Sequence, residues 1–187
     1  PRRLPPRCAT VDVWARPRQT RRQMRLKGVQ TWEDAVQAYE MGLAGVVLSN
    51  HGGRQLDFAR SGVEVLEEVM RELRKRGSFP NPAFQVMVDG GFRRGTDILK
   101  ALAMGATAVG IGRPFLYAYS AYGVDGVIHA INLLRDELEM NMRLIGARSI
   151  EELVPSMVDL SALHNHTGAV FPEQDQSVLD FMEKSRL

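Results

Sequence analysis

Short apolar runs alternate with helix-like segments from residue 24 onward. The run at 44–48 is apolar on both faces and rich in β-branched residues, which is typical of a strand buried in a parallel sheet. The predicted strands are 24–29, 44–48, 84–88 and 108–111, and the predicted helices are 31–41, 63–76, 95–104, 124–145 and 149–157. Repeated strand–loop–helix units predict an α/β fold.

The ends of the predicted helices carry capping residues. Thr31 precedes the first helix and Gly42 follows it. A threonine N-cap and a glycine after the last turn satisfy backbone groups that a helix leaves free. Ser149, with Glu152 three residues later, has the form of a capping box and predicts the start of the last helix.

The first chemical cluster, residues 49–57, directly follows the second predicted strand. His51 is followed by two glycines, where the backbone can pass close to a ligand. Histidine is well suited to accept a proton near neutral pH, and Arg54 offers a planar fork of donors for a carboxylate. A base beside a carboxylate clamp is what the oxidation of a 2-hydroxy acid requires. From spacing alone, a helix-capping loop histidine with Arg54 on the surface fits equally well.

Two glycine-rich turns follow the third and fourth predicted strands. They contain Asp89, Gly90, Gly91, Arg93 and Arg94, and then Gly110, Gly112 and Arg113. Glycine N–H groups, a helix N-terminus and an arginine can together bind a phosphate, although either turn alone also fits an ordinary strand-to-helix connection. The Walker and dinucleotide patterns are absent, which favours a mononucleotide such as a flavin over NAD or ATP.

The order of these clusters suggests a TIM barrel. In a (β/α)₈ barrel the carboxyl ends of the strands form the active-site face, and the phosphate site often follows strands 7 and 8. If the glycine-rich turns are those loops, the four strands are the fifth to eighth, and Lys27 ends the fifth. We therefore expect the C-terminal half of a barrel, with its N-terminal half missing.

Composition narrows the class of protein. Residues 1–23 are rich in arginine and proline and have no hydrophobic period, so we expect disorder there, with a mitochondrial transit peptide as the alternative. Residues 28–187 hold fifteen basic and twenty-one acidic side chains, which disfavours nucleic-acid binding. No apolar run reaches the roughly 18 residues of a membrane span, and the single Cys8 excludes a disulfide framework or a cysteine metal site.

The clusters resemble the FMN-dependent 2-hydroxy-acid dehydrogenase and oxidase family. The resemblance covers about residues 26–163, in order and spacing, and we find none in residues 1–23. It rests on Lys-Gly-Val at 27–29, Ser-Asn-His-Gly-Gly-Arg-Gln-Leu-Asp at 49–57, Asp-Gly-Gly-Phe-Arg-Arg-Gly-Thr-Asp at 89–97 and Gly-Arg-Pro-Phe at 112–115. Residues 134–140 and 153–163 look more like the flavocytochrome L-lactate dehydrogenases than the glycolate oxidases.

The resemblance implies FMN as the cofactor and a role for each matching residue. His51 would be the catalytic base, and Arg54 would clamp the substrate carboxylate. Lys27 would face the pyrimidine side of the flavin ring, and Ser49 would hydrogen-bond the flavin. The ribityl chain and phosphate would be held by Asp89, Gly90, Gly91, Arg93, Gly112 and Arg113, with Arg94 the less favoured of the two neighbouring arginines.

The resemblance also implies a biological setting. The substrate would be L-lactate, the electron acceptor cytochrome c or oxygen, the compartment mitochondrial and the assembly a homo-oligomer. The alternatives are a peroxisomal glycolate-type oxidase that uses oxygen, or a truncated family fragment without activity. We expect three regions: a basic segment at 1–23, a partial barrel at 24–163 and a tail at 164–187.

Overall fold

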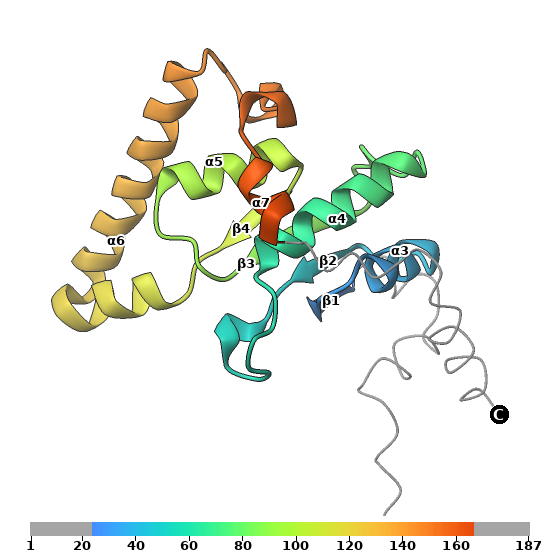
Figure 1. The fold of residues 1–187 in the computed structure, drawn as a ribbon. Coiled ribbons are helices and arrows are strands. Elements are labelled where there is room, and N and C mark those ends of the chain that lie inside the picture. The colour runs from blue at the N-terminus through green and yellow to red at the C-terminus, as the bar shows by residue number, and fades with distance from the viewer. Residues whose placement is uncertain (1–23, 167–187) are drawn as a thin grey trace, which may run out of the picture.

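Figure 1 shows the computed structural model of the chain, which describes the backbone of residues 24–166 and the side chains of residues 24–163. The expectations of disorder in residues 1–23 and of a tail beyond residue 166 fall outside these residues. In the described part, a four-stranded parallel sheet has the order β1-β2-β3-β4. The strands are β1 (Arg25–Val29), β2 (Gly45–Leu48), β3 (Gln85–Asp89) and β4 (Ala108–Gly110). The predicted parallel α/β sheet is confirmed.

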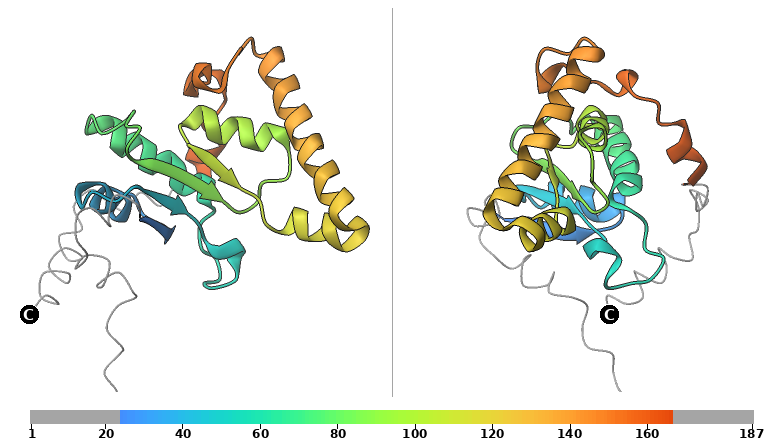
Figure 2. Two further views of the ribbon diagram at one scale, coloured as in Figure 1. Left: turned by 180° about the vertical axis from the view of Figure 1, so that it is seen from behind. Right: turned by 90° about the vertical axis from the view of Figure 1, so that its left-hand side faces the viewer.

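The helices follow the strands in turn, and α3, α4 and α5 lie side by side along the sheet (Figures 1 and 2). The α-helices are α3 (Trp32–Glu40), α4 (Gly62–Lys75), α5 (Gly95–Met104), α6 (Arg113–Leu144) and α7 (Ser161–His166). Short 3₁₀ turns occur at η1 (His51–Gly53), η2 (Ile150–Glu152) and η3 (Pro155–Met157). Thr31 caps α3 as predicted, because its hydroxyl accepts from the Asp34 N–H.

The core lies between the sheet and these helices. Val46, Leu48, Val86 and Val88 alternate along β2 and β3 and are buried against α4. The residues between them, including Met87, point to the opposite face of the sheet and are half-buried. The helix-covered face therefore supplies most of the hydrophobic stabilisation.

Two predicted helices differ from the observed ones. The helix expected at 124–145 begins eleven residues earlier, at Arg113, and Gly123 breaks it with φ 61° and ψ −144°. Pro114 stands in its first turn, where its missing N–H costs nothing, so the helix starts directly after the glycine-rich turn.

The prediction of a helix at 149–157 is wrong. The segment forms η2 and η3 instead, with Val154 extended at φ −129° and ψ 154° because the following Pro155 disfavours helical backbone before it. Ser149 makes no side-chain cap. The Glu152 carboxylate turns to Arg148 instead, accepting from its backbone N–H at 2.9 Å and from its guanidinium at 2.7 Å.

The start of α4 contacts the ends of two strands. A Cβ on Gly62 would lie 2.7 Å from the Asp89 carbonyl oxygen, 2.8 Å from Val88 Cγ2 and 2.9 Å from the Leu48 carbonyl oxygen. Only glycine lets the helix approach the sheet this closely.

We therefore expect Gly62→Ala to lower the free energy of unfolding by about 2 to 3 kcal/mol, the usual cost of overpacking a tight contact. The control is Gly42→Ala, at a left-handed position with open space around it, where backbone strain alone should cost about 1 kcal/mol. Urea unfolding followed by circular dichroism measures both. A loss at Gly62 no larger than that at Gly42 would contradict the close contact.

Candidate active site

The carboxyl ends of three strands meet at one charged group. Lys27 on β1 donates from Nζ to Ser49 Oγ, just after β2, at 2.8 Å. The same Nζ lies 3.0 Å from Asp89 Oδ2 at the end of β3. Strand register explains the meeting, since Lys27 pairs with Val47 and Val47 with Met87. Ser49 and Asp89 each lie two residues further along and point to the same side of the sheet.

The Asp89 carboxylate is only partly satisfied. Its Oδ2 pairs with Lys27, but Oδ1 is buried and has no hydrogen-bond partner among the described residues. β4 runs close beside it, because a Cβ on Gly110 would lie 2.9 Å from the Asp89 Cβ. A buried acceptor without a donor costs about 1 to 3 kcal/mol. The open position therefore suits a ligand that carries a hydroxyl or N–H group.

His51 lies on a tight loop that begins at Ser49. The Ser49 hydroxyl accepts from the His51 N–H at 3.1 Å, and the Asn50 side chain accepts from the Gly53 N–H at 3.1 Å. His51 has a left-handed φ of 57°, followed by 67° at Gly52 and 71° at Gly53. A left-handed residue other than glycine is uncommon and marks a backbone held in place by its surroundings. Asn50, which the sequence analysis did not single out, organises this loop.

Arg54 follows on the same loop, as the sequence predicted. His51 and Arg54 are both exposed, and neither side chain makes a hydrogen bond or ion pair with the described residues. Leu56 and Phe58 are also exposed, the latter at 99%, on a loop that projects from the body of the molecule (Figure 1). The base and clamp roles assigned to His51 and Arg54 stay predictions.

The two glycines of the first glycine-rich turn have left-handed backbone, with φ of 94° at Gly90 and 87° at Gly91. The backbone N–H groups at the start of α5, which follows this turn, already have acceptors, however. The N–H groups of Arg93 and Arg94 both donate to the Asp97 carboxylate at 3.1 Å. The Gly95 N–H donates to Glu137 of α6 at 2.8 Å. Two carboxylates thus already accept from the N–H groups at the start of α5, and a contribution of this helix N-terminus to a phosphate site stays a prediction.

The second glycine-rich turn reaches the His51 loop. Arg113 donates from Nη2 to the Gly52 carbonyl oxygen at 2.6 Å. Gly112 has open space where a Cβ would stand. The structure thus brings together Lys27, Ser49 and Asp89, and separately joins Arg113 to the loop of His51. Neither long-range contact was foreseen from the sequence.

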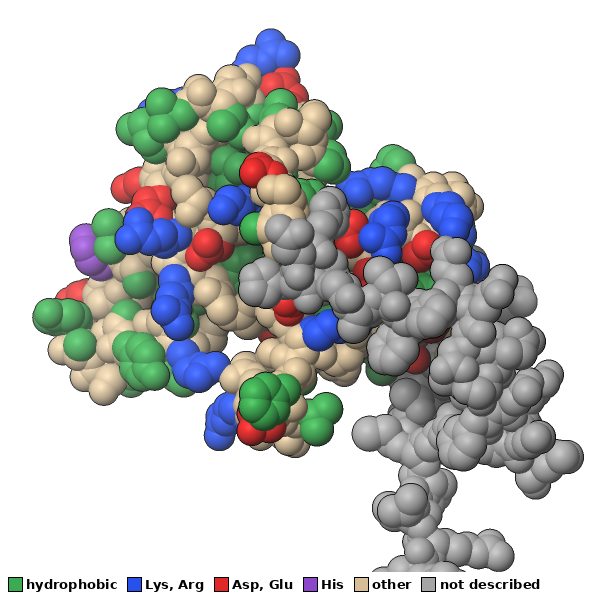
Figure 3. Space-filling model, in the orientation of Figure 1, with side chains coloured by type: hydrophobic (Ala, Val, Ile, Leu, Met, Phe, Trp, Pro, Cys, Tyr) green, Lys and Arg blue, Asp and Glu red, His purple; other side chains and the backbone are tan. Residues whose placement is uncertain are grey.

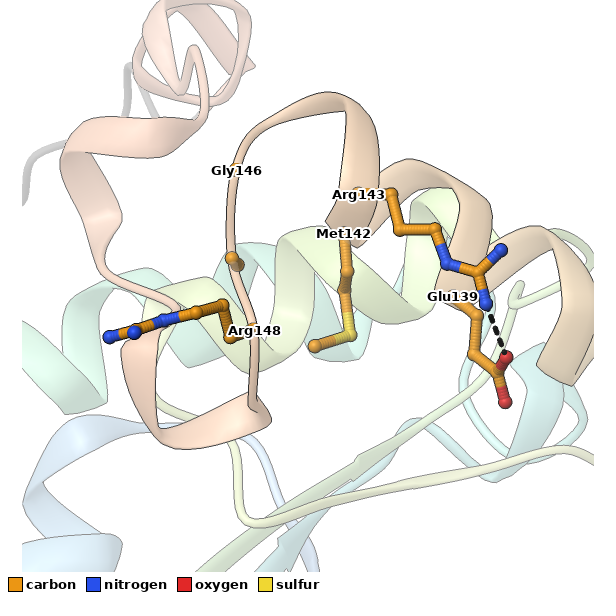
Figure 4. Close-up of a pocket in the computed structure, with 6 residues that line it drawn as sticks. Glu139, Met142, Arg143, Gly146 and Arg148 are labelled. Carbon is orange, nitrogen blue, oxygen red and sulfur yellow. Dashed lines mark hydrogen bonds and ion pairs between the residues drawn. The ribbon is translucent and has the colours of Figure 1, made fainter.

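Neither of two pockets in the described chain is lined by these residues. A pocket of about 440 Å³ at the end of α6 is lined by Met142, Arg143, Gly146 and Arg148 among others. Figure 4 shows Arg143 turned to Glu139, with which it forms an ion pair at 3.5 Å. A second, apolar pocket of about 300 Å³ lies between α5, β4 and α6. Apolar side chains also gather on the surface over the first part of α6 (Figure 3).

Two further features are absent from the described part of the chain. It holds no group of three histidine, cysteine or acidic side chains placed to bind a metal ion. None of the helices within residues 24–166 has the length and apolar character needed to cross a membrane.

Comparisons with known proteins show the family. The family model described as FMN-dependent dehydrogenase matches residues 7–160. The chain belongs to this family. The match begins at residue 7, so the absence of any resemblance in residues 1–23 is corrected for residues 7–23.

Curated relatives of this FMN-dependent dehydrogenase include both dehydrogenases and oxidases. An L-lactate dehydrogenase (cytochrome) of Wickerhamomyces anomalus is 60% identical over 75% of this chain and 24% of its own length. The Saccharomyces cerevisiae enzyme of the same name is 52% identical over 89% and 28%. A peroxisomal (S)-2-hydroxy-acid oxidase of Oryza sativa is 50% identical over 71% and 34%. The chain thus spans about a quarter to a third of these relatives.

Solved structures show the same fold. A flavocytochrome b2 with sulfite bound matches with a TM-score of 0.79 and 49% identity, over 95% of this chain and 45% of that one. A mandelate oxidase with benzoyl-formic acid matches with a TM-score of 0.64 and 42% identity, over 71% and 38%. The fold is therefore that of the flavocytochrome b2 flavin domain, in the TIM barrel family. Which half of a barrel the four strands represent stays a prediction.

The described residues fit FMN, the cofactor of the family. The unpartnered Asp89 Oδ1 is an acceptor for a hydroxyl such as those of a ribityl chain. Lys27 and Ser49 place a positive charge and a hydroxyl beside it. Arg113 adds a guanidinium, the group best shaped to bind phosphate, next to the open backbone of Gly112.

The Lys27–Asp89 contact predicts an energetic coupling. In a double-mutant cycle with Lys27→Met and Asp89→Asn, we expect a coupling free energy of about 1 kcal/mol. The Asp89 side chain is 24% exposed, so water screens this pair less than it screens a fully exposed pair, although Lys27 itself is half-exposed. The matched control is Arg143→Met with Glu139→Gln, a pair 3.5 Å apart whose side chains are both more than half exposed. Its coupling should be smaller. Equal couplings in urea unfolding would mean that the three strand ends do not depend on Lys27.

Proposed function

We propose that this chain carries the base, the carboxylate clamp and the phosphate-binding arginines of an enzyme that oxidises L-2-hydroxy acids, with L-lactate as the substrate. The observation that carries the proposal is the convergence of Lys27, Ser49 and Asp89 at the carboxyl edge of the sheet, beside the His51 loop. Two relatives named L-lactate dehydrogenase (cytochrome) support lactate as the substrate.

The proposed mechanism uses the side chains at this edge. Arg54, exposed and without an ion-pair partner among the described residues, would clamp the substrate carboxylate in two places. His51 would then accept a proton as the alcohol carbon becomes a carbonyl. FMN, when bound, supplies the acceptor for the two electrons and the second proton that leave the substrate. Lys27 would stabilise negative charge at the ring, and Arg93 and Arg113 would hold the phosphate.

The second candidate is a glycolate-type oxidase that passes electrons to oxygen. The relative from Oryza sativa, named as a peroxisomal (S)-2-hydroxy-acid oxidase, favours it with 50% identity. Turnover of L-lactate and of glycolate, each with cytochrome c or with oxygen as acceptor, separates the two. Lactate with cytochrome c should be the faster pair, and faster oxygen consumption with glycolate would favour the oxidase instead.

The electron acceptor, compartment and assembly belong to the same proposal. We infer a cytochrome acceptor, a mitochondrial location and a homo-oligomer. The words "L-lactate dehydrogenase (cytochrome)" in the names of two relatives support the first of these. Cell fractionation and light scattering of the purified protein test the other two.

We predict that His51→Gln abolishes reduction of bound FMN by L-lactate, slowing it by at least about a hundredfold, because the proton acceptor is lost. FMN binding should stay within about twofold, since the His51 side chain makes no hydrogen bond with the described residues. Anaerobic bleaching of the flavin absorbance measures the first effect, and quenching of flavin fluorescence the second.

The matched control is His129→Gln, which changes an exposed histidine on α6. It should alter neither measurement. Equal loss of binding and reduction in His51→Gln would give His51 a structural role. If the wild-type chain binds no FMN supplied in excess, the chain by itself is a family fragment without activity.

A further inference from the structure

Arg113 lies where the turn after β4 meets the His51 loop, although 61 positions of sequence separate it from Gly52. We propose that Arg113 is a positioning residue, which ties the backbone of the His51 loop to the phosphate-binding turn. Occupancy of the phosphate site would then fix the position of the proposed base. This inference rests on the proposed function, because it takes His51 as the base and the turn as the phosphate site.

The contact is close and shaped for an arginine. Nη2 of Arg113 donates to the Gly52 carbonyl oxygen at 2.6 Å. A Cβ on Gly52 would lie 3.0 Å from the same nitrogen, so the guanidinium also rests against the face of this glycine. Any larger residue at position 52 would push the guanidinium away, and the left-handed φ of 67° disfavours one as well.

The His51 loop needs an outside anchor. Three successive residues, His51, Gly52 and Gly53, have left-handed backbone. The hydrogen bonds from the His51 and Gly53 N–H groups go to Ser49 and Asn50, at the base of the loop itself. The residues that follow, 54–58, are exposed. Arg113, which lies in the connection between β4 and α6, therefore supplies a hydrogen bond to the Gly52 carbonyl oxygen from outside the loop.

The guanidinium can do two things at once. It carries five N–H donors in a rigid plane, and one of its nitrogens, Nη2, donates to the Gly52 carbonyl oxygen. The other nitrogens make no hydrogen bond to the described residues and are available to a phosphate. A phosphate held there would fix the plane and strengthen the hold on Gly52. A lysine, with one compact charge, would attract the phosphate but would not bridge it to the loop.

The test follows backbone amide hydrogen exchange in residues 50–54 of the wild type, Arg113→Ala, Arg113→Lys and Arg93→Ala. Each protein is measured alone, with saturating FMN and with saturating riboflavin, which has the same ring and ribityl chain but no phosphate. Arg93→Ala is the matched control, since Arg93 is a proposed phosphate ligand that makes no hydrogen bond or ion pair with the His51 loop among the described residues. Flavin fluorescence confirms saturation in every sample.

Without a flavin, exchange in residues 50–54 should be about five- to tenfold faster in Arg113→Ala than in the wild type, the effect of one hydrogen bond. Arg93→Ala should match the wild type. FMN should slow exchange more than riboflavin does in the wild type and in Arg93→Ala. In both Arg113 variants the two flavins should protect equally, even though Arg113→Lys binds FMN more tightly than Arg113→Ala.

Two results would overturn the inference and leave the proposed function standing. One is unchanged loop exchange in Arg113→Ala, and the other is equal protection by FMN and riboflavin in the wild type. Failure of the wild type to bind FMN would instead remove the proposed function of this chain and the coupling to phosphate. The flavin-free comparison would still decide whether Arg113 holds the loop.

Discussion

The site depends on one partly buried polar arrangement, in which the Lys27 ammonium group lies between the Ser49 hydroxyl and the Asp89 carboxylate. It joins the carboxyl ends of three parallel strands, which the sheet places along one edge. Asp89 would otherwise hold a carboxylate near the core without a cation, at a cost that folding has to offset. Ser49 is 2% exposed, and its hydroxyl also accepts from the His51 N–H. It therefore links the Lys27 contact to the backbone of the His51 loop.

Close backbone approach supports the same arrangement. Asp89 is flanked by Gly62 at the start of α4 and by Gly110 of β4, and a Cβ at either position would come within 3 Å of it. These glycines let a helix and a strand lie against the residue that carries the unpartnered oxygen. The chemistry of this edge therefore requires tight packing around Asp89 as well as the polar side chains themselves.

The sheet ends in open strands within the described residues, because β1 and β4 each pair on one side. Beside β4, an apolar pocket lies under α6, and several large apolar side chains of that helix are exposed. The flavocytochrome b2 structures that share this fold are more than twice as long as the part that this chain matches. The open strands and this apolar face thus lie on the same sheet that carries the site residues.

Local pattern determined much of this protein. The alternation of strand-like and helix-like segments located all four strands, the ends of α5 were predicted to the residue, and the glycine and histidine clusters revealed the family. Only the tertiary structure decided how the clusters meet: Lys27 with Asp89, Arg113 with Gly52, and Glu137 at the N-terminus of α5. Periodicity and capping act within a few residues, so sequence reveals them. The contacts between distant segments depend on strand register and on how α6 packs against α5, which no short segment of the sequence encodes.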